Sequence, residues 1–537
     1  LVQPCDEVAE IRELAAYRQT DWAAALSEFR RYWDEMLAPA AAIEVPEAHV
    51  VNMVRAVLTQ LMINADGDIV PYGSDPSWYS GRLYGVEEGY AMMALAQAGF
   101  LNDAQRYMDG TYLTPQFLVK VPEYKKYEDR HQQYRNGLQP HYAVSAYRLS
   151  RDRTWIERHL PLLRQCAEWT LAERRKTMVL ENGERPLHYG LLPKWSYGGD
   201  ISELQCYALY ANFACWKGLV DTAWLLQELG DLKAAERYRA DADDYWQSIE
   251  RAVEGNYRRE HQPPFLPLQL YADQPVGDDY DQLFAGTLLH LHAWDPAGRQ
   301  IRYVTDFLEQ DNRTFCLLPR FRRDVGAGGL DGLYGLGYIL TKLQQDRIDE
   351  FLLGFYGYLA FNLERSTFAA RETNLIYASD LHLRSRYKVP EMSDPVPCSA
   401  AVAVQLLRHM LVTETRPAPD QPADGLRLLA GAPRAWLADG RTIRLQRLPT
   451  EFGMVSLEVV SSAAQGRIEA SIEPPKRNPC NAVQLRLRDP QGRRLVRVRV
   501  NGRPLSEFDA DRDLIRLPPG SGEYRVVAEF AEPSADR

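Results

Sequence analysis

The fold is decided by the stretch S-W-Y-S-G-R-L-Y-G-V-E-E-G-Y-A-M-M-A-L-A-Q-A-G, residues 77–99, which joins a polar loop to an apolar helix. The loop is aromatic and basic, two adjacent carboxylates follow at Glu87 and Glu88, and the Ala-, Met- and Leu-rich run after them ends at a glycine. At helical spacing Glu88 shares a face with Met92, and Glu87 lies on the neighbouring face, so either carboxylate can point into a cavity. Acidic residues in a first helical turn also complement the helix dipole, so a purely structural role for the pair stays open.

Further apolar segments with helical spacing lie on both sides of this stretch, and they come in pairs. From residue 48 to residue 411 the pattern predicts about twelve helices, joined alternately by short turns and by long loops rich in aromatic and charged residues. This alternation indicates six helical hairpins arranged in a ring, with the long loops at one end of it. Long loops in a compact domain are usually functional, so we expect the site to be assembled from them. Besides the central helix, helices are expected at about residues 48–63, 102–112, 138–149, 154–172, 203–229, 232–253, 282–292, 298–309, 331–343, 346–364 and 399–411.

The helical pattern ends at T-R-P-A-P-D-Q-P-A-D, residues 415–424, a proline-rich stretch that marks a domain boundary. Beyond it, short runs alternate apolar and polar residues as strands do, and Asn501-Gly502 is a turn signal between two of them. We therefore predict a mainly α protein with a β domain. Its parts are an N-terminal helical extension (1–44, with a helix at 22–37), a helical domain (45–414) and a small antiparallel β-sandwich (425–537). Strands are expected at 443–445, 455–460, 468–472, 483–487, 495–500 and 524–530.

Composition narrows the class of protein. A chain of 537 residues exceeds a single ordinary core, so two or more domains are expected. The formal net charge of -10, without a dense Lys/Arg run, argues against a nucleic-acid partner. No apolar run approaches the length that spans a bilayer, which argues against a membrane protein. The 30 tyrosines and 11 tryptophans favour a carbohydrate ligand, because aromatic faces stack on sugars.

The sequence indicates no cofactor and no metal. Its seven cysteines are scattered without a C-x-x-C pair, which argues against a zinc cluster and a disulfide framework. The D-D-Y-D run at 278–281 lacks the glycine and the closing glutamate of an EF-hand loop, and the Gly-rich run at 326–337 follows no predicted strand, as a dinucleotide loop would. A signal peptide is either absent or already removed, because the sequence starts without Met or a leader. The oligomeric state stays open.

Five segments spread over the helical and β parts carry a resemblance. They are V-P-E-A-H-V-V-N-M-V-R-A-V-L-T-Q (45–60), Y-G-V-E-E-G-Y (84–90), L-P-K-W-S-Y-G-G-D (192–200), L-G-D-L-K-A-A-E-R-Y (229–238) and L-L-A-G-A-P-R-A-W-L (428–437). Together they resemble the six-hairpin glycosidases, bacterial enzymes that have an (α/α)6 barrel followed by a β-sandwich. This superfamily includes α-L-rhamnosidases, α-L-fucosidases and exo-acting uronidases. The resemblance implies an exo-acting glycoside hydrolase for plant or bacterial oligo- or polysaccharides, located in the bacterial cytoplasm, in the periplasm or outside the cell.

Hydrolysis of a glycosidic bond needs a carboxylic acid that protonates the leaving oxygen and a carboxylate that activates water or attacks the anomeric carbon. We predict Glu88, or its neighbour Glu87, as the acid. In similar enzymes a carboxylate in the corresponding late loop acts as the base, which implies Glu372 here. Asp200 and Asp279 are the alternatives for the base. We expect inversion, with the two carboxyl groups about 6.5–9.5 Å apart, against about 5–5.5 Å for retention.

The long loops also carry aromatic and basic side chains that suit a sugar. Aromatic rings stack on sugar rings, and cationic groups bind a carboxylate, which together with the resemblance indicates a uronic acid or a deoxy sugar as substrate. The same side chains can have a purely structural role. They can pack under the loops or form ion pairs, such as Arg371 with Glu372, without binding a ligand. We expect Trp78, Trp195, Asp200, Arg320 and Glu372 to converge on one cavity. The full set of predicted substrate-binding residues is Trp78, Tyr79, Arg82, Lys194, Trp195, Tyr197, Asp279, Arg320, Arg371 and Tyr377.

Two other functions stay open from the sequence. His131 and His141 lie near Tyr134 and Tyr142, and polysaccharide lyases with a helical toroid use Tyr/His sets to remove the proton beside a uronate carboxyl group. A sugar-binding barrel that has lost its catalytic acids is the non-enzymatic alternative.

Overall fold

The computed structural model describes residues 20–73, 85–113, 133–196, 205–262, 264–270, 285–310, 313–321, 329–371, 374–375, 395–477, 480–520 and 522–532. The chain divides into two compact units, Leu1–Ala40 and Ala41–Arg537. The first unit contains α2 (Trp22–Leu37), which begins and ends at the predicted residues. The carboxylate of Asp21 accepts hydrogen bonds from the backbone N–H groups of Ala23 and Ala24 (3.0 and 3.2 Å), which satisfies donors that a helix start leaves free.

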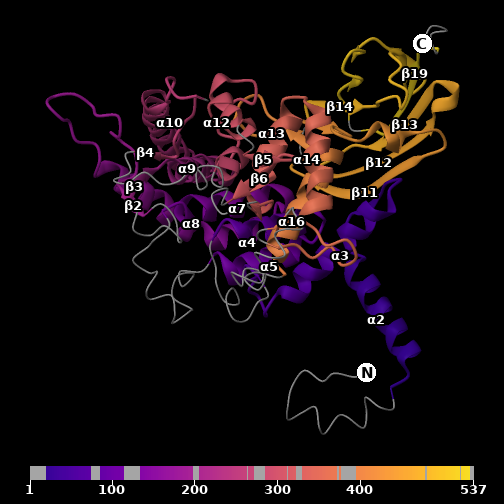
Figure 1. Cartoon of the computed structure of the whole chain (residues 1–537), viewed down its shortest axis with the longest axis horizontal. Coiled ribbons are helices and arrows are strands. Elements are labelled where there is room, and N and C mark those ends of the chain that lie inside the picture. Colours follow the sequence, from indigo (N-terminus) through magenta and orange to yellow (C-terminus); the bar gives the residue numbers. More distant parts are fainter. Residues whose placement is uncertain are drawn as a thin grey trace. The chain divides into compact units, whose positions relative to one another are not determined.

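The second unit is mainly helical from α3 (Ala48–Asn64) to α16 (Pro397–Leu411), as the sequence predicts (Figure 1). A further helical segment occupies residues 285–290. The other described helices of this part are α4 (Glu87–Gln97), α5 (Leu101–Thr111), α7 (Arg135–Ser150), α8 (Arg153–Arg175), α9 (Leu209–Leu229), α10 (Leu232–Asn256), α12 (Arg299–Glu309), α13 (Leu336–Gln344) and α14 (Ile348–Phe361).

Fully buried helices alternate along the chain with helices that bury one face. Every residue of α4 is buried, and so are residues 209–226 of α9. By contrast α10 buries a stripe at helical spacing that includes Tyr238, Ala242 and Tyr245, and exposes much of its other side. This alternation is that of inner helices covered by outer ones.

The buried helices pack against one another in chain order. Helix α4 contacts α7, α7 contacts α9, α13 contacts α16, and α16 contacts α3 and α4 again. The approach of α7 to α9 requires glycine, because a Cβ atom on Gly137 would lie 2.1 Å from the carbonyl carbon of Ala214. In the same way, a Cβ atom on Gly286 would lie 1.6 Å from the carbonyl oxygen of Tyr334, which places the segment 285–290 against the start of α13. The first and last helices of the helical part therefore lie together.

The strands after α16 (Figure 1, orange to yellow), together with β1 from the start of the second unit, build two sheets. Their orders are β1-β11-β12-β13-β19-β15-β16 and β17-β18-β14-β10-β9, and neighbours are antiparallel except β10 and β14. The bounds are β1 (Ala42–Glu44), β9 (Val412–Thr415), β10 (Gly425–Leu428), β11 (Thr442–Thr450), β12 (Gly453–Ser462), β13 (Arg467–Glu473), β14 (Ala482–Arg486), β15 (Leu495–Val500), β16 (Arg503–Leu505), β17 (Phe508–Asp509), β18 (Leu514–Leu517) and β19 (Tyr524–Phe530).

All the predicted strands are present, and their alternating pattern has the expected cause. In β13 the residues Ile468, Ala470 and Ile472 are buried while their neighbours are exposed. The turn signal is also confirmed, because Asn501 and Gly502 have φ values of 51° and 78° and join β15 to β16. The proline-rich stretch 415–424 connects β9 to its antiparallel neighbour β10 within one sheet. The domain boundaries, the barrel and the sandwich stay predictions.

Residues 42–44, assigned from the sequence to a helical extension, instead form β1. This strand pairs antiparallel with β11, with Ile43 opposite Leu445. A strand this short forms only through its partner, which lies about 400 residues away, so local sequence does not predict it.

The long loops, expected to lack regular structure, contain short strands. These are β2 (Trp195–Ser196), β3 (Gln205–Ala208), β4 (Gln269–Leu270), β5 (Thr314–Phe315), β6 (Leu318–Phe321), β7 (Gly329–Leu330) and β8 (Asn374–Leu375). They make the small sheets β2-β3-β4 and β5-β6-β7-β8. Strand β3 replaces the start of the helix predicted at 203–229, because pairing with β2 and β4 holds it extended.

The glycine contact between α7 and α9 gives a test of this packing. Alanine favours a helix over glycine, yet we expect Gly137→Ala to lower the free energy of unfolding by about 1–3 kcal/mol, because the added methyl group overpacks the contact. Denaturant unfolding measures the change. Gly522→Ala, at a site with open space around the Cβ position, is the control and should be nearly neutral. Equal stability of Gly137→Ala and the wild type would contradict the close approach.

Candidate functional site

The carboxyl groups of Glu87 and Glu88 are both buried at the start of α4, with 5% and 0% of their surface exposed. The backbone N–H of Gly85 donates to Oε2 of Glu88 (2.7 Å), and that of Val86 donates to Oε2 of Glu87 (3.1 Å). The hydroxyl group of Tyr334 donates to Oε1 of Glu87 at 2.5 Å. Backbone N–H groups at the start of α4 therefore orient both carboxyl groups. Tyr334, which lies 247 residues after Glu87 in the sequence, also orients Glu87.

The environment of Glu87 changes its proton affinity. Burial, and after it the charge of Glu88, raises the pKa of Glu87 to about 7, although the hydrogen bond from Tyr334 acts in the opposite direction. A carboxyl group with such a pKa holds its proton for part of the time at neutral pH. This is the property of a general acid.

Side chains from distant helices surround this pair. Tyr210 is the second residue of α9, Cys398 is the second residue of α16, and Tyr334 lies in the 3-10 turn Leu333–Gly335 that leads into α13. The groups whose pKa is raised by burial and also by the charge of Glu87 are Tyr90, Tyr112, Tyr142, Tyr210 and Cys398. The starts of several buried helices thus meet at the two carboxyl groups.

A third carboxylate, Asp331, belongs to the same neighbourhood and was missed from the sequence. It is 2% exposed, and after burial its charge contributes to the raised pKa of Tyr90 and of Tyr358. Its backbone N–H donates to the carbonyl oxygen of Pro319 (2.9 Å). Asp331 and Tyr334 lie in the Gly-rich run at 326–337 and within the helix predicted at 331–343, and neither is among the predicted site residues. In the sequence, Asp331 can be recognised as an acidic residue shortly before an apolar helix, which is the pattern that also marks Glu87.

Of the remaining predicted site residues, the structure describes Lys194, Trp195, Arg320 and Arg371. Trp195 of β2 pairs with Cys206 of β3, which lies three residues before the start of α9, the helix that carries Tyr210. Arg320 of β6 is 7% exposed and pairs with Leu330 of β7, the residue before Asp331. Both strands therefore lead to the neighbourhood of the carboxyl groups. The residues Trp78, Tyr79, Arg82, Tyr197, Asp200, Asp279, Glu372 and Tyr377 lie outside the described residues, so the predicted convergence stays a prediction.

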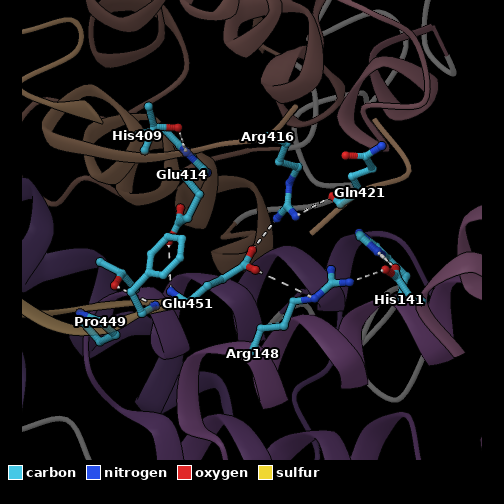
Figure 2. Close-up of polar contacts among 12 residues, drawn as sticks. His141, Arg148, His409, Glu414, Arg416, Gln421, Pro449 and Glu451 are labelled. Carbon is cyan, nitrogen blue, oxygen red and sulfur yellow. Dashed lines mark hydrogen bonds and ion pairs between the residues drawn. The ribbon is translucent and has the colours of Figure 1, made fainter. Parts of the chain in front are cut away.

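His141, a candidate base in the lyase hypothesis, is part of an ion-pair network. Its Nδ1 atom lies 2.7 Å from Oδ2 of Asp221, and Lys217 Nζ and Arg148 Nη2 contact the other carboxylate oxygen at 2.8 and 3.0 Å. Figure 2 shows that Arg148 also faces Glu451 (3.9 Å), which contacts Arg416. Burial lowers the pKa of His141 despite its contact with Asp221. The second candidate histidine, His131, lies outside the described residues.

The described part of the chain contains no group of three or more His, Cys, Asp or Glu side chains that is placed to hold a metal ion. Among its helices, none combines the length and the apolar content that crossing a bilayer requires.

No family model matches the sequence, and no curated protein matches it. Solved structures match the fold. The α-L-rhamnosidase from Dictyoglumus thermophilum aligns with a TM-score of 0.50 and 10% identity, over 91% of this chain and 50% of that chain. The GH78 family rhamnosidase of Bacillus sp. GL1 aligns with a TM-score of 0.51 and 13% identity, over 79% of this chain and 40% of that chain. These matches confirm the resemblance to glycosidases at the level of the fold.

The raised pKa of Glu87 predicts a pH-dependent stability. Between its usual pKa of 4.5 and about 7, the folded state binds more protons than the unfolded state, so the free energy of unfolding falls as the pH rises through this window. We expect the wild type to lose about 3 kcal/mol relative to Glu87→Gln from pH 4.5 to pH 7.5. Urea unfolding at a series of pH values measures the difference.

Glu236→Gln, an exposed position on α10, is the matched control and should follow the wild-type pH profile. Parallel profiles for the wild type and Glu87→Gln would mean that Glu87 titrates normally.

Proposed function

We propose that the protein is a glycoside hydrolase, and that its buried helices form the inner layer of an (α/α)6 barrel whose site lies at their starts. The observation that carries the proposal is the pair Glu87 and Glu88, buried side by side, with the pKa of Glu87 at about 7. A carboxyl group that keeps its proton for part of the time at neutral pH is what the acid step of glycosidic-bond hydrolysis requires. The contact of α16 with α3 and α4 supports a closed barrel. The shared fold with glycosidases supports the reaction class.

In this proposal Glu87 protonates the leaving oxygen. Burial, and after it the charge of Glu88, keeps the pKa of Glu87 high, and the hydrogen bond from Tyr334 fixes the direction of the carboxyl group. The start of a helix favours a charged carboxylate and so opposes a general acid. Burial outweighs this effect for Glu87, since the pKa is raised overall. Glu88 is the alternative acid, as the sequence suggested.

We propose Glu372 as the base that activates water. The residues around it are held near the other site segments, because the backbone N–H of Val396 donates to the carbonyl oxygen of Ala370 (2.8 Å) and Asn374 pairs with Leu330. Val396 precedes α16, and Leu330 precedes Asp331. These contacts support a base from this loop. Asp331 joins Asp200 and Asp279 as the alternatives.

We further propose an exo-acting, inverting enzyme whose sugar carries a carboxylate or lacks a hydroxyl group. Support comes from the cationic side chains of Lys194, Arg320 and Arg371, since guanidinium and ammonium groups suit a carboxylate ligand. The lyase alternative is less favoured, because His141 is engaged by Asp221 and its pKa is lowered by burial.

A panel of aryl glycosides and acidic polysaccharides tests the proposal. We expect hydrolysis of at least one substrate, and a loss of about 10²–10⁴ in kcat for Glu87→Gln and for Glu372→Gln, the range for removing one acid or base group. Dinitrophenyl glycosides need no protonation of the leaving group, so they should restore the rate of Glu87→Gln but not that of Glu372→Gln. Glu236→Gln is the control and should act as the wild type.

Proton NMR of the first product formed identifies its anomer and tests inversion. Near-normal turnover of Glu372→Gln would move the base to Asp331, Asp200 or Asp279. A product that absorbs near-ultraviolet light would identify a lyase, and sugar binding without turnover would identify a binding protein.

A further inference from the structure

Outside the candidate site, a pocket with a volume of about 320 Å³ lies beyond the end of α13. One wall is the first turn of α14, and the other walls come from the 3-10 turn Arg434–Leu437, from Arg486 and Arg488 at the end of β14, and from the residues before β18. None of these residues belongs to the neighbourhood of Glu87. The pocket is therefore a separate feature of the same compact unit.

Two arginines in this pocket are buried with unused donors. Arg486 is 2% exposed, donates from Nη1 to the carbonyl oxygen of Ala430 (2.6 Å) and contacts Asp346 through Nη2. The side chain of Arg488 is 12% exposed, and its Nη2 atom reaches Asp349 only at 3.3 Å. Among the described residues, no acceptor lies within hydrogen-bond distance of Arg486 Nε or of Arg488 Nη1. Buried donors of charged groups are costly to leave without an acceptor.

The charges around these arginines also favour an anionic ligand. Burial, and after it the charge of Arg434, lowers the pKa of Arg488, and burial followed by the charge of Arg486 lowers the pKa of nearby Arg427 to about 10. The pocket holds five arginines and five carboxylates, but the side chains of Asp349 and Asp511 are 93% and 83% exposed. Water screens these two carboxylates far more than the buried arginines. The side chains of Arg347 and Arg512 are also well exposed (43% and 47%), so the excess of positive charge is local to Arg488, whose contact Asp349 is the most strongly screened carboxylate.

The start of α14 adds backbone donors to the same wall. The first N–H groups of a helix have no acceptor within the helix and carry its positive dipole end. The N-cap residue, Arg347, offers no side-chain hydrogen bond to them, and Ile348, the first residue of this 14-residue helix, lines the pocket. Arginine side chains combined with a helix start are a common way to bind phosphate, sulfate or carboxylate groups.

We propose that this pocket binds the oxyanion group of a small ligand, with the guanidinium groups of Arg488 and Arg486 and the start of α14 as donors. Arg434 holds Asp513 in place through a 2.9 Å contact and contributes charge. The volume exceeds that of a lone phosphate, so a sugar or a similar small group can accompany the anion. Anion binding at this pocket requires neither Glu87 nor hydrolysis, so it can be tested independently of the proposed enzyme activity.

Isothermal titration calorimetry of the full chain with inorganic phosphate, sulfate and D-glucuronate tests the proposal, with D-glucose as the uncharged control. We expect at least one of the three anions to bind with a Kd below about 1 mM, and glucose not to bind at this site. Binding of phosphate or sulfate alone would identify a tetrahedral ligand group, and binding of glucuronate alone would identify a carboxylate. Failure of all three anions to bind would overturn the proposal.

Arg488→Gln should weaken the binding at least about tenfold, because it removes a buried charged donor. Without ligand this variant should unfold at the wild-type temperature or above it, since it also removes a buried charge that lacks a full partner. The matched control is Arg499→Gln, an exposed arginine on β15, which should leave the affinity unchanged. An equal loss of affinity in both variants would indicate nonspecific charge binding and would exclude this pocket as the site.

Discussion

The burial of two adjacent carboxyl groups at the start of one helix is the constraint on which the candidate site depends. Taking ionised carboxylates out of water costs several kcal/mol each unless hydrogen bonds or a proton compensate. Gly85, Val86 and Tyr334 supply hydrogen bonds, and Glu87 accepts a proton at a higher pH than usual. Tyr334 belongs to the far end of the helical part, so this compensation exists only when the helices have assembled.

A second set of buried charges fixes the helices against the strands. Arg408 of α16 forms a two-pronged contact with Glu414 of β9 (2.5 and 2.7 Å) and also donates to the carbonyl oxygen of Pro449 (2.8 Å). Outside this buried set, the exposed residue Arg477, after β13, donates to the carbonyl oxygen of Leu149 at the end of α7 (2.7 Å). Buried charges of this kind tolerate little displacement, because each loses its compensation when a partner moves. The helices that carry the site are thus held from the β part of the chain.

The sequence predicted those features that depend on local pattern. The helix at 22–37 and the strands of the β part follow from apolar periodicity, and Glu87 and Glu88 were selected because an acidic pair preceded an apolar helix. The failures have one physical origin, since each depends on partners far away in the chain. Strand β3 forms through β2 and β4, and Tyr334 acquires its role only through Glu87, 247 residues earlier. The raised pKa of Glu87 likewise rests on its burial in the assembled fold, which the local sequence does not show.

The pairing of β1 with β11 has a consequence for synthesis of the chain. Ile43 leaves the ribosome about 400 residues before Leu445, its partner in the sheet. At about 5–20 residues per second, the strand waits roughly 20–80 s for that partner, while the helices that follow it are already being made. During this time the backbone N–H and C=O groups of β1 are free to pair with another edge, so a growing chain is exposed to wrong pairing at this strand until β11 arrives.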